Sequence, residues 1–250
     1  MNNEVVLSVN DLKKSYDNVL AIQDVNLTMY RGEILGVLGR NGAGKTTLIE
    51  SLVGLRQPDS GDISIYNKEQ KKLSAKEIKE YIGIQLQEYS LFERQTIQEI
   101  LELFGSLYKK SIPVKELLTK LDLINVKDKQ IRELSQGQRQ RVNIGVALIG
   151  DPEILLLDEP TAGLDVHIRL LMWDILEYLK KEGKAILITT HHMEEAERLC
   201  DRISILHDKT VLDTDNTTSF IQKFARKDNY TLENAFINIT TQKLEGSKEK

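Results

Sequence analysis

The sequence predicts an α/β protein whose core is a mostly parallel sheet with helices on both faces. Three patterns support this fold class: strands alternate with helices in the second half of the chain, apolar residues alternate near the N-terminus, and a helical stretch separates these two parts. In the second half we expect strands at residues 154–157, 185–189 and 203–206, and helices at residues 166–179 and 193–199. Such alternation is typical of parallel strands covered on both sides.

The N-terminal region is predicted to form an antiparallel β-subdomain that leads into a strand, a loop and a helix. Apolar residues occupy alternate positions in residues 5–9 and again in residues 25–29, which favours two half-buried strands. A strand buried on both faces is expected at residues 33–38, followed by a glycine-rich loop at residues 39–44 and a helix at residues 45–52.

An inserted helical subdomain is predicted over about residues 88–150, where apolar residues recur at helical spacing. We therefore expect one main domain over residues 1–210, interrupted by this insertion, and a short C-terminal extension over residues 211–250. The elements expected in the extension are helices at residues 217–224 and 232–239 and a frayed polar tail at residues 241–250.

Composition excludes several classes of protein. The 250 residues carry a formal charge of −4 and 40% apolar residues, which is an ordinary globular composition. The longest apolar runs are far shorter than the roughly 18 residues that span a bilayer, so a role at a membrane would need another chain. No secretory signal is evident and Cys200 is the single cysteine, which favours the cytoplasm. The mild acidity gives no support for nucleic acid as a partner.

A phosphate-binding loop is predicted between the strand at residues 33–38 and the helix at residues 45–52. Glycines let successive backbone N–H groups point at a triphosphate, and the helix N-terminus adds its positive dipole. Lys45 would reach the β- and γ-phosphates of ATP, and Thr46 would place its hydroxyl on Mg²⁺. The alternative is an ordinary glycine-rich turn. The residues assigned to this ATP-binding loop are Gly39, Arg40, Asn41, Gly42, Ala43, Gly44, Lys45, Thr46 and Thr47.

Two adjacent acids, Asp158 and Glu159, end the apolar run at residues 154–157. We expect this strand to lie beside the strand that precedes the phosphate loop, so that Asp158 can anchor Mg²⁺ through a water molecule. Glu159 would polarise the attacking water as a general base. The alternative is a solvated acidic turn before Pro160.

A third motif gives a family resemblance. Residues 134–138 resemble the signature of ATP-binding cassette (ABC) proteins, with Gln136 where the usual form has glycine, and the similarity covers about residues 4–210. The resemblance implies a P-loop NTPase cassette in which two subunits close head to tail. Each signature then completes the ATP site of the other subunit. Ser135 can cap the following helix and offer its hydroxyl and the helix dipole to a facing γ-phosphate. The signature residues assigned to ATP are Ser135, Gly137 and Gln138.

The same resemblance implies roles for four further residues. Tyr16 corresponds to the aromatic residue that stacks on adenine, although a Tyr there could also be a half-buried residue of a strand edge. Gln87 corresponds to the sensor of metal and water, with Gln85 as its competitor. His191 resembles the switch histidine that contacts the γ-phosphate, and Asp165 resembles the acid that couples the two sites of the dimer. Asp165 could also cap the helix that follows.

The resemblance implies the ATP-hydrolysing subunit of a two-component transporter, powered by ATP and Mg²⁺. Its expected partners are a separately encoded transmembrane permease and a second cassette, in a homodimer, at the inner face of the cell membrane. Residues 161–165, 193–197 and 232–236 together resemble bacterial ABC-2 type exporter cassettes of the drug and polysaccharide kind. An importer subunit, or a cassette protein that acts on ribosomes or DNA, is the alternative. Tyr89, Leu91, Phe92 and Phe104 would either receive the permease or pack in the core.

Overall fold

A computed structural model describes residues 4–87, 91–226 and 229–246 of the chain. Its core is a mixed sheet in which the central strand β3 (Ile34–Leu38) pairs in parallel with a strand on either side. Only β9 at one edge runs antiparallel to its neighbour among the strands of this sheet that the structure describes. This architecture confirms the predicted α/β class. The strand order is β5 (Ile82–Gln85), β6 (Ile154–Asp158), β7 (Ala185–Thr190), β3, β8 (Arg202–His207) and β9 (Thr210–Asn216).

The position of β6 corrects one expectation from the sequence. We expected β6 beside β3, but β7 lies between them and pairs with both strands. Every residue of β7 is buried, as expected for a central strand. Its backbone hydrogen-bonds to β3 along one edge and to β6 along the other. Asp158 nevertheless reaches the loop after β3, because parallel strands all end at the same edge of the sheet.

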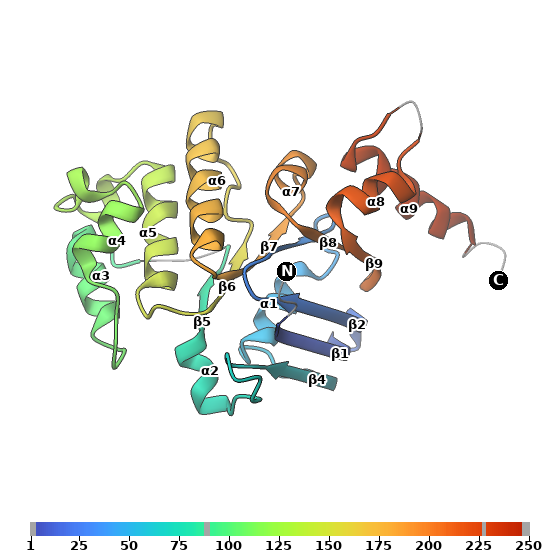
Figure 1. Cartoon of the computed structure of the whole chain (residues 1–250), viewed down its shortest axis with the longest axis horizontal. Helices are drawn as coiled ribbons and strands as arrows, with labels where there is room; N and C mark the ends of the chain where they lie inside the picture. Colours follow the sequence, from blue (N-terminus) through green and yellow to red (C-terminus); the bar gives the residue numbers. More distant parts are fainter. Residues whose placement is uncertain (1–3, 88–90, 227–228, 247–250) are drawn as a thin grey trace.

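The two faces of the sheet pack against different layers. Leu155 and Leu157 of β6 join a core formed with the helices, whereas Ile154 and Leu156 of the same strand face the opposite core. One face is thus covered by α5 (Gln136–Leu148), α6 (Val166–Lys181) and α7 (Met193–Leu199). The other face is covered by α1 (Lys45–Leu52) and the N-terminal sheet, on the opposite side in Figure 1.

The N-terminal sheet is antiparallel, as predicted, with the order β2-β1-β4. Its strands are β1 (Val5–Tyr16), β2 (Val19–Tyr30) and β4 (Ser60–Ile65). Asp17 and Asn18 connect β1 to β2 with φ values of 46° and 68°. Two successive positive φ angles are the geometry of a tight hairpin turn that suits the twist of the strands. The turn leaves Tyr16 paired with Val19 at the end of the hairpin.

Helices α3 (Ile97–Gly105) and α4 (Val114–Lys120) pack beside α5 at one end of the molecule (Figure 1). Two short 3₁₀ turns, Ile124–Val126 and Ile131–Glu133, connect α4 to α5. Thr96 begins α3 with a reciprocal capping box to Glu99, which satisfies backbone N–H groups that the helix cannot pair. A separate helix, α2 (Ala75–Tyr81), lies before β5.

The C-terminal helices α8 (Thr217–Phe224) and α9 (Leu232–Gly246) pack on the same side of the sheet as α7. α8 has the predicted bounds. α9 is longer than predicted, because it continues past residue 239 to Gly246, through the start of the tail that we expected to be frayed. Phe236, Ile239 and Thr240 are buried, and these contacts hold the helix against the core at the point where the sequence becomes polar.

Candidate functional site

The glycine-rich loop joins β3 to α1 with the order that a phosphate site requires. Gly44 caps α1 with φ 113°, and a Cβ atom there would lie 2.5 Å from the carbonyl oxygen of Ala21, so only glycine fits. Lys45 follows and is buried, and its Nζ donates to the carbonyl oxygen of Gly39 at 2.9 Å. The loop thus curls around the ammonium group of Lys45, the group predicted to bind the phosphates of ATP.

A pocket of about 430 Å³ opens on this loop. It brings together five segments that are far apart in sequence: the β1–β2 hairpin, the phosphate loop, the segment after β5, the segment after β6 and the β8–β9 turn. Gly39 and Arg40 instead line a second cavity of about 510 Å³, beside His191 and α9, and Ala43 packs into the core. The residues that line the first pocket are Tyr16, Val19, Leu20, Ala21, Asn41, Gly42, Gly44, Lys45, Thr46, Thr47, Gln87, Glu159 and Lys209.

Asp158 has both carboxylate oxygens engaged at the floor of the site. The hydroxyl of Thr46 donates to Oδ2 at 2.9 Å, and the hydroxyl of Thr189 donates to Oδ1. The side chain is almost completely buried, so an ionised carboxylate needs these donors. A hydroxyl and a carboxylate in contact are the hard oxygen ligands that suit Mg²⁺, so the residues present fit the predicted metal.

Glu159 adopts a left-handed backbone conformation, with φ 49°, immediately after β6. Its N–H donates both to the carbonyl oxygen and to the hydroxyl oxygen of Thr189, each at 3.1 Å. Its Oε1 lies 3.3 Å from Nζ of Lys45 and 3.1 Å from Nδ1 of His191. Burial raises the pKa of Glu159, but the hydrogen bond from His191 and the charge of Lys45 outweigh burial, so the pKa is lowered from its ordinary value.

The structure places His191 and its neighbour His192, and it separates the two glutamines that the sequence left open. His191 contacts Glu159, whereas the side chain of His192 stacks on the ring of His191 with centroids 4.1 Å apart. Gln87 is exposed and lines the pocket. Gln85 is buried in β5, where its amide donates to the backbone oxygen of Leu86 at 2.7 Å. Of these four side chains, Gln87 lines the pocket and His191 contacts Glu159, whereas Gln85 also reaches the backbone oxygen of Asp158 at 3.4 Å.

The signature residues lie at the start of α5, away from the pocket of their own chain. Ser135 accepts from the N–H of Gln138 at 3.3 Å, and the Gln138 side chain accepts from the N–H of Ser135 at 3.1 Å. This reciprocal capping box leaves the helix N-terminus exposed. Gly137 is required by packing, because a Cβ atom there would lie 2.4 Å from Cγ2 of Ile168. Ser135 is therefore exposed and Gln138 half-buried, whereas Gly137 is buried beneath them.

One contact links this region to the loop after Glu159, and a second contact caps the helix that follows the loop. Gln136 donates from Nε2 to the carbonyl oxygen of Ala162 at 3.4 Å, so the residue that departs from the family signature points to its own chain. Asp165 accepts from the N–H of Ile168 at 3.1 Å and caps α6, which confirms the capping alternative for this residue. Its coupling role stays a prediction.

Tyr16 stands at the mouth of the pocket, where Lys14 Nζ and Arg56 Cζ lie 5.7 Å and 5.8 Å from its ring centroid. Two other contributors to the pocket were not predicted from the sequence. The start of β2 forms one wall, and Lys209 donates to the carbonyl oxygen of Gly42 from the β8–β9 turn. These residues carry no motif, and only the fold brings them to the loop.

The residues that we expected either to receive a permease or to pack in the core differ in burial. Leu91 is buried and Phe104 packs against the core, whereas Phe92 is 57% exposed. Tyr89 lies outside the described residues. None of the helices in the described ranges has the length and apolar character needed to cross a membrane.

Comparisons with known proteins agree with this site. Residues 22–162 match a family model described as ABC transporter. The chain is 41% identical over 203 residues to the Nod factor export ATP-binding protein I of Burkholderia lata, over 79% of this chain and 66% of that protein. It is 37% identical over 200 residues to the ABC transporter ATP-binding protein NatA of Bacillus subtilis, over 78% of this chain and 81% of that protein. The chain thus spans about two thirds of the length of the Nod factor relative.

Solved structures give the same result. The ATP binding subunit of an ABC transporter has a TM-score of 0.81 at 28% identity, over 94% of this chain and 99% of that chain. A dimeric ATP-binding cassette in a post-hydrolysis state, bound to ADP and Pi, has a TM-score of 0.73 at 27% identity, over 84% of this chain and 98% of that chain. These matches confirm the predicted fold, nucleotide class and ATPase class, and they show that the chain belongs to the ABC transporter family.

Proposed function

We propose that the chain is the ATP-hydrolysing subunit of a two-component exporter whose permease is a separate chain. The observation that carries this proposal is the convergence of five side chains: Lys45, Thr46 and Glu159 line one pocket, Asp158 accepts from Thr46, and His191 contacts Glu159. The names of the relatives, Nod factor export ATP-binding protein I and NatA, support the transport role and, for the first, the direction.

ATP would bind with its adenine on Tyr16 and its triphosphate in the loop at residues 39–47. Lys45 would leave Glu159 and pair with the β- and γ-phosphates. Thr46, Asp158 through a water molecule, and Gln87 would hold Mg²⁺. When bound, the ion neutralises charge that develops on the phosphate oxygens.

Glu159 would act as the general base. The oxygen of the attacking water bonds to the γ-phosphorus, the bond to the bridging oxygen breaks, ADP leaves, and the water proton passes to the Glu159 carboxylate. Burial raises the pKa of this carboxyl, but Lys45 and His191 lower it by more, so the pKa lies below its ordinary value. When both groups turn to the γ-phosphate, burial remains, and the carboxylate becomes a stronger base in the ATP-bound state.

A second copy of the chain would complete each ATP site. Ser135 is exposed at the N-terminus of α5 and does not line the pocket of its own chain. We propose that Ser135, Gly137 and Gln138 bind the γ-phosphate held by the other protomer, and that Asp165 couples the two sites. The dimeric cassette among the structural relatives supports such an assembly.

Closure of the cassette dimer would act on the permease in the membrane. We propose that residues 1–210 form the ATPase unit, that the insertion at about residues 88–150 receives the permease near the exposed Phe92, and that residues 211–250 extend the unit. The protein would then be peripheral at the cytoplasmic face of the membrane. Co-purification with a polytopic membrane protein is expected, and retention on ribosomes or DNA without one would overturn the transport role.

Glu159→Gln tests the hydrolytic role directly. The substitution keeps the shape of the side chain and removes the base, so ATP binding should persist while turnover is nearly abolished. ATP and Mg²⁺ should then trap a dimer that gel filtration with light scattering detects. Glu177→Gln, at a half-buried position of α6 that pairs with Arg198, is the matched control and should hydrolyse ATP at the parental rate. Parental turnover by the Glu159→Gln protein would refute the assigned base.

A further inference from the structure

We propose that Thr189 is a positioning residue for hydrolysis, because its hydroxyl fixes Asp158 and Glu159 relative to each other. The proposal rests on the proposed function. Thr189 is completely buried near the end of β7, directly opposite Asp158 in the β6–β7 pairing. Its hydroxyl bonds to the side chain of one acid and to the backbone of the next.

The direction of each hydrogen bond follows from the groups present. An ionised carboxylate only accepts, so the hydroxyl of Thr189 donates its single hydrogen to Oδ1 of Asp158. The backbone N–H of Glu159 only donates, and it donates to the Thr189 oxygen at 3.1 Å. One hydroxyl therefore satisfies both acids without competition, because its donor and a lone pair are used separately.

Both acids need this support. Thr46 occupies only Oδ2 of Asp158, so Thr189 supplies the bond that stops the carboxylate from rotating away from Thr46. Glu159 has a φ of 49°, a conformation that residues other than glycine rarely adopt and that persists only when its surroundings impose it. The hydroxyl and carbonyl oxygens of Thr189 hold its N–H in that conformation.

The neighbouring threonine serves a different purpose. The hydroxyl of Thr190 accepts from the N–H of His192 at 2.9 Å, in the turn that carries the histidines. Side chains alternate along a strand, so residues 189 and 190 point to opposite faces of β7. The link between the metal carboxylate and the base is therefore a property of Thr189 and not of the threonine pair.

Thr189→Val is the decisive variant, since valine keeps the branched shape and removes the hydroxyl. Changes to groups that orient metal ligands typically cost about 10- to 100-fold in metal affinity or activity. We expect kcat to fall within this range with a much smaller change in KM for ATP, and half-saturation to require more Mg²⁺. Thr189→Ser should retain parental behaviour because it keeps the hydroxyl.

A binding measurement separates positioning from general destabilisation. In a Glu159→Gln background, which does not turn over, ATP binding is titrated with Mg²⁺ and with EDTA. We expect Thr189→Val to bind ATP like its parent in EDTA and to gain less affinity from Mg²⁺. Thr214→Val removes another hydroxyl bond of the same sheet, a partly buried one to Ser204 at 2.9 Å, and should leave both kcat and the Mg²⁺ dependence unchanged.

The outcomes are distinguishable from failure of the proposed function. If the parent protein does not hydrolyse ATP, the proposed function fails first. If the parent is active and Thr189→Val keeps the parental kcat and Mg²⁺ dependence, the role of Thr189 is overturned. Equal losses in Thr189→Val and Thr189→Ser also overturn it, because the hydroxyl is then not the cause. If Thr189→Val does not fold, Thr189→Ala replaces it in the same comparisons.

Discussion

Nζ of Lys45 lies 3.3 Å from Oε1 of Glu159, and Nδ1 of His191 lies 3.1 Å from the same oxygen. The acid assigned as the base is thus held by the two groups assigned to the phosphates of ATP. A carboxylate with two such partners is stabilised in its ionised form and is a weak base. ATP would compete for both partners, so the arrangement favours activation of Glu159 only when nucleotide is bound.

This pairing predicts a pH-dependent contribution of Glu159 to stability. The folded-state pKa is lowered from the ordinary value of 4.5. The contribution is therefore present above the unfolded-state pKa and is lost as the pH falls through the folded-state pKa. We expect the difference in free energy of unfolding between the parent and Glu159→Gln to be constant above about pH 5.5 and to become smaller below about pH 4.5.

Urea titrations at a series of pH values, without nucleotide, measure this difference. When the same comparison is made in a Lys45→Met background, the difference in free energy of unfolding should depend less on pH, because one of the groups that lowers the pKa of Glu159 is gone. A difference that stays the same from neutral pH to the acidic limit of folding would contradict the pairing.

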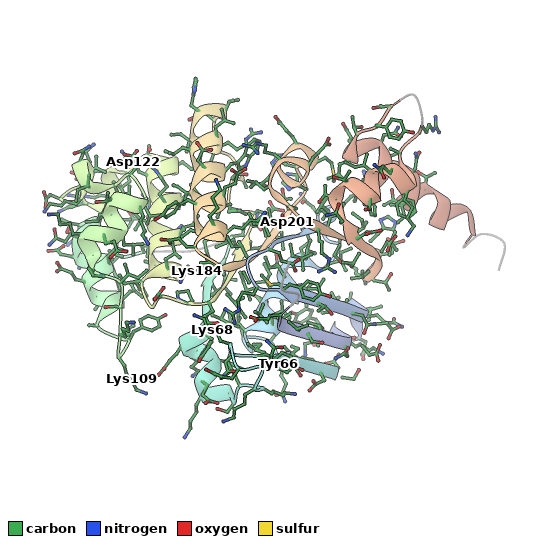
Figure 2. The ribbon with its side chains drawn as sticks, in the orientation of Figure 1. Tyr66, Lys68, Lys109, Asp122, Lys184 and Asp201 are labelled. Atoms are coloured by element: carbon green, nitrogen blue, oxygen red, sulfur yellow. The ribbon has the colours of Figure 1, made fainter. Side chains whose placement is uncertain are left out.

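Lys45→Ala should weaken nucleotide binding itself. Hydrogen bonds to charged groups contribute about 1.5–3 kcal/mol, so the dissociation constant for ATP should rise by roughly 10- to 100-fold. Lys109→Ala is the control, because Lys109 is an exposed lysine of the helical insertion and pairs with Glu80 (Figure 2). Isothermal titration with ATP compares the two variants. Equal affinities for both would remove Lys45 from the phosphate site.

Ser135→Arg should leave ATP binding to the isolated subunit intact and block closure of the dimer. Ser135 is exposed at the start of α5, where an arginine would place bulk and charge against the facing protomer. In a Glu159→Gln background with ATP, we expect light scattering to show a monomer for Ser135→Arg. Ser106→Arg, at the end of α3, should still form the dimer. A closed dimer of the Ser135→Arg protein would count against the role of the signature.

Gln136 links two segments assigned to the dimer interface within one chain. Its Nε2 donates to the carbonyl oxygen of Ala162 at 3.4 Å, and a Cβ atom at Gly163 would lie 2.6 Å from the same nitrogen. Gln136→Gly restores the common signature residue and removes this contact. We expect the Hill coefficient of ATP hydrolysis to change while ATP binding by the monomer does not. An unchanged Hill coefficient would show that the contact does not affect coupling.

The sequence predicted those features that local chemistry determines. The helix at residues 45–52 was predicted with its observed bounds because glycines precede it, and Asp165 was weighed as a cap because its residue type favours that position. The order β6-β7-β3 was not predicted, because strand pairing depends on contacts between distant segments. For the same reason Lys209 reaches the pocket without any motif.

Arg141 should contribute strongly to the stability of the helical insertion. The side chain is buried, and Nη1 donates to the backbone oxygens of Leu121 and Asp122 at 3.1 Å and 2.8 Å. It also pairs with the Asp122 carboxylate at 2.9 Å, a residue that Figure 2 marks at the helical end of the molecule. Arg141→Leu would leave buried carbonyl groups without a donor, which costs about 1–3 kcal/mol for each group.

Asp122→Asn separates the ion pair from the backbone contacts of Arg141. The Asp122 side chain is 66% exposed, and exposed ion pairs contribute about 0–1 kcal/mol, so this variant should unfold close to the parental midpoint. Arg141→Leu should unfold at clearly lower urea concentration, by a free energy several times larger. If the two variants were equally destabilised, the charge on Asp122 and not the pairing of the backbone oxygens would be the source of the stability.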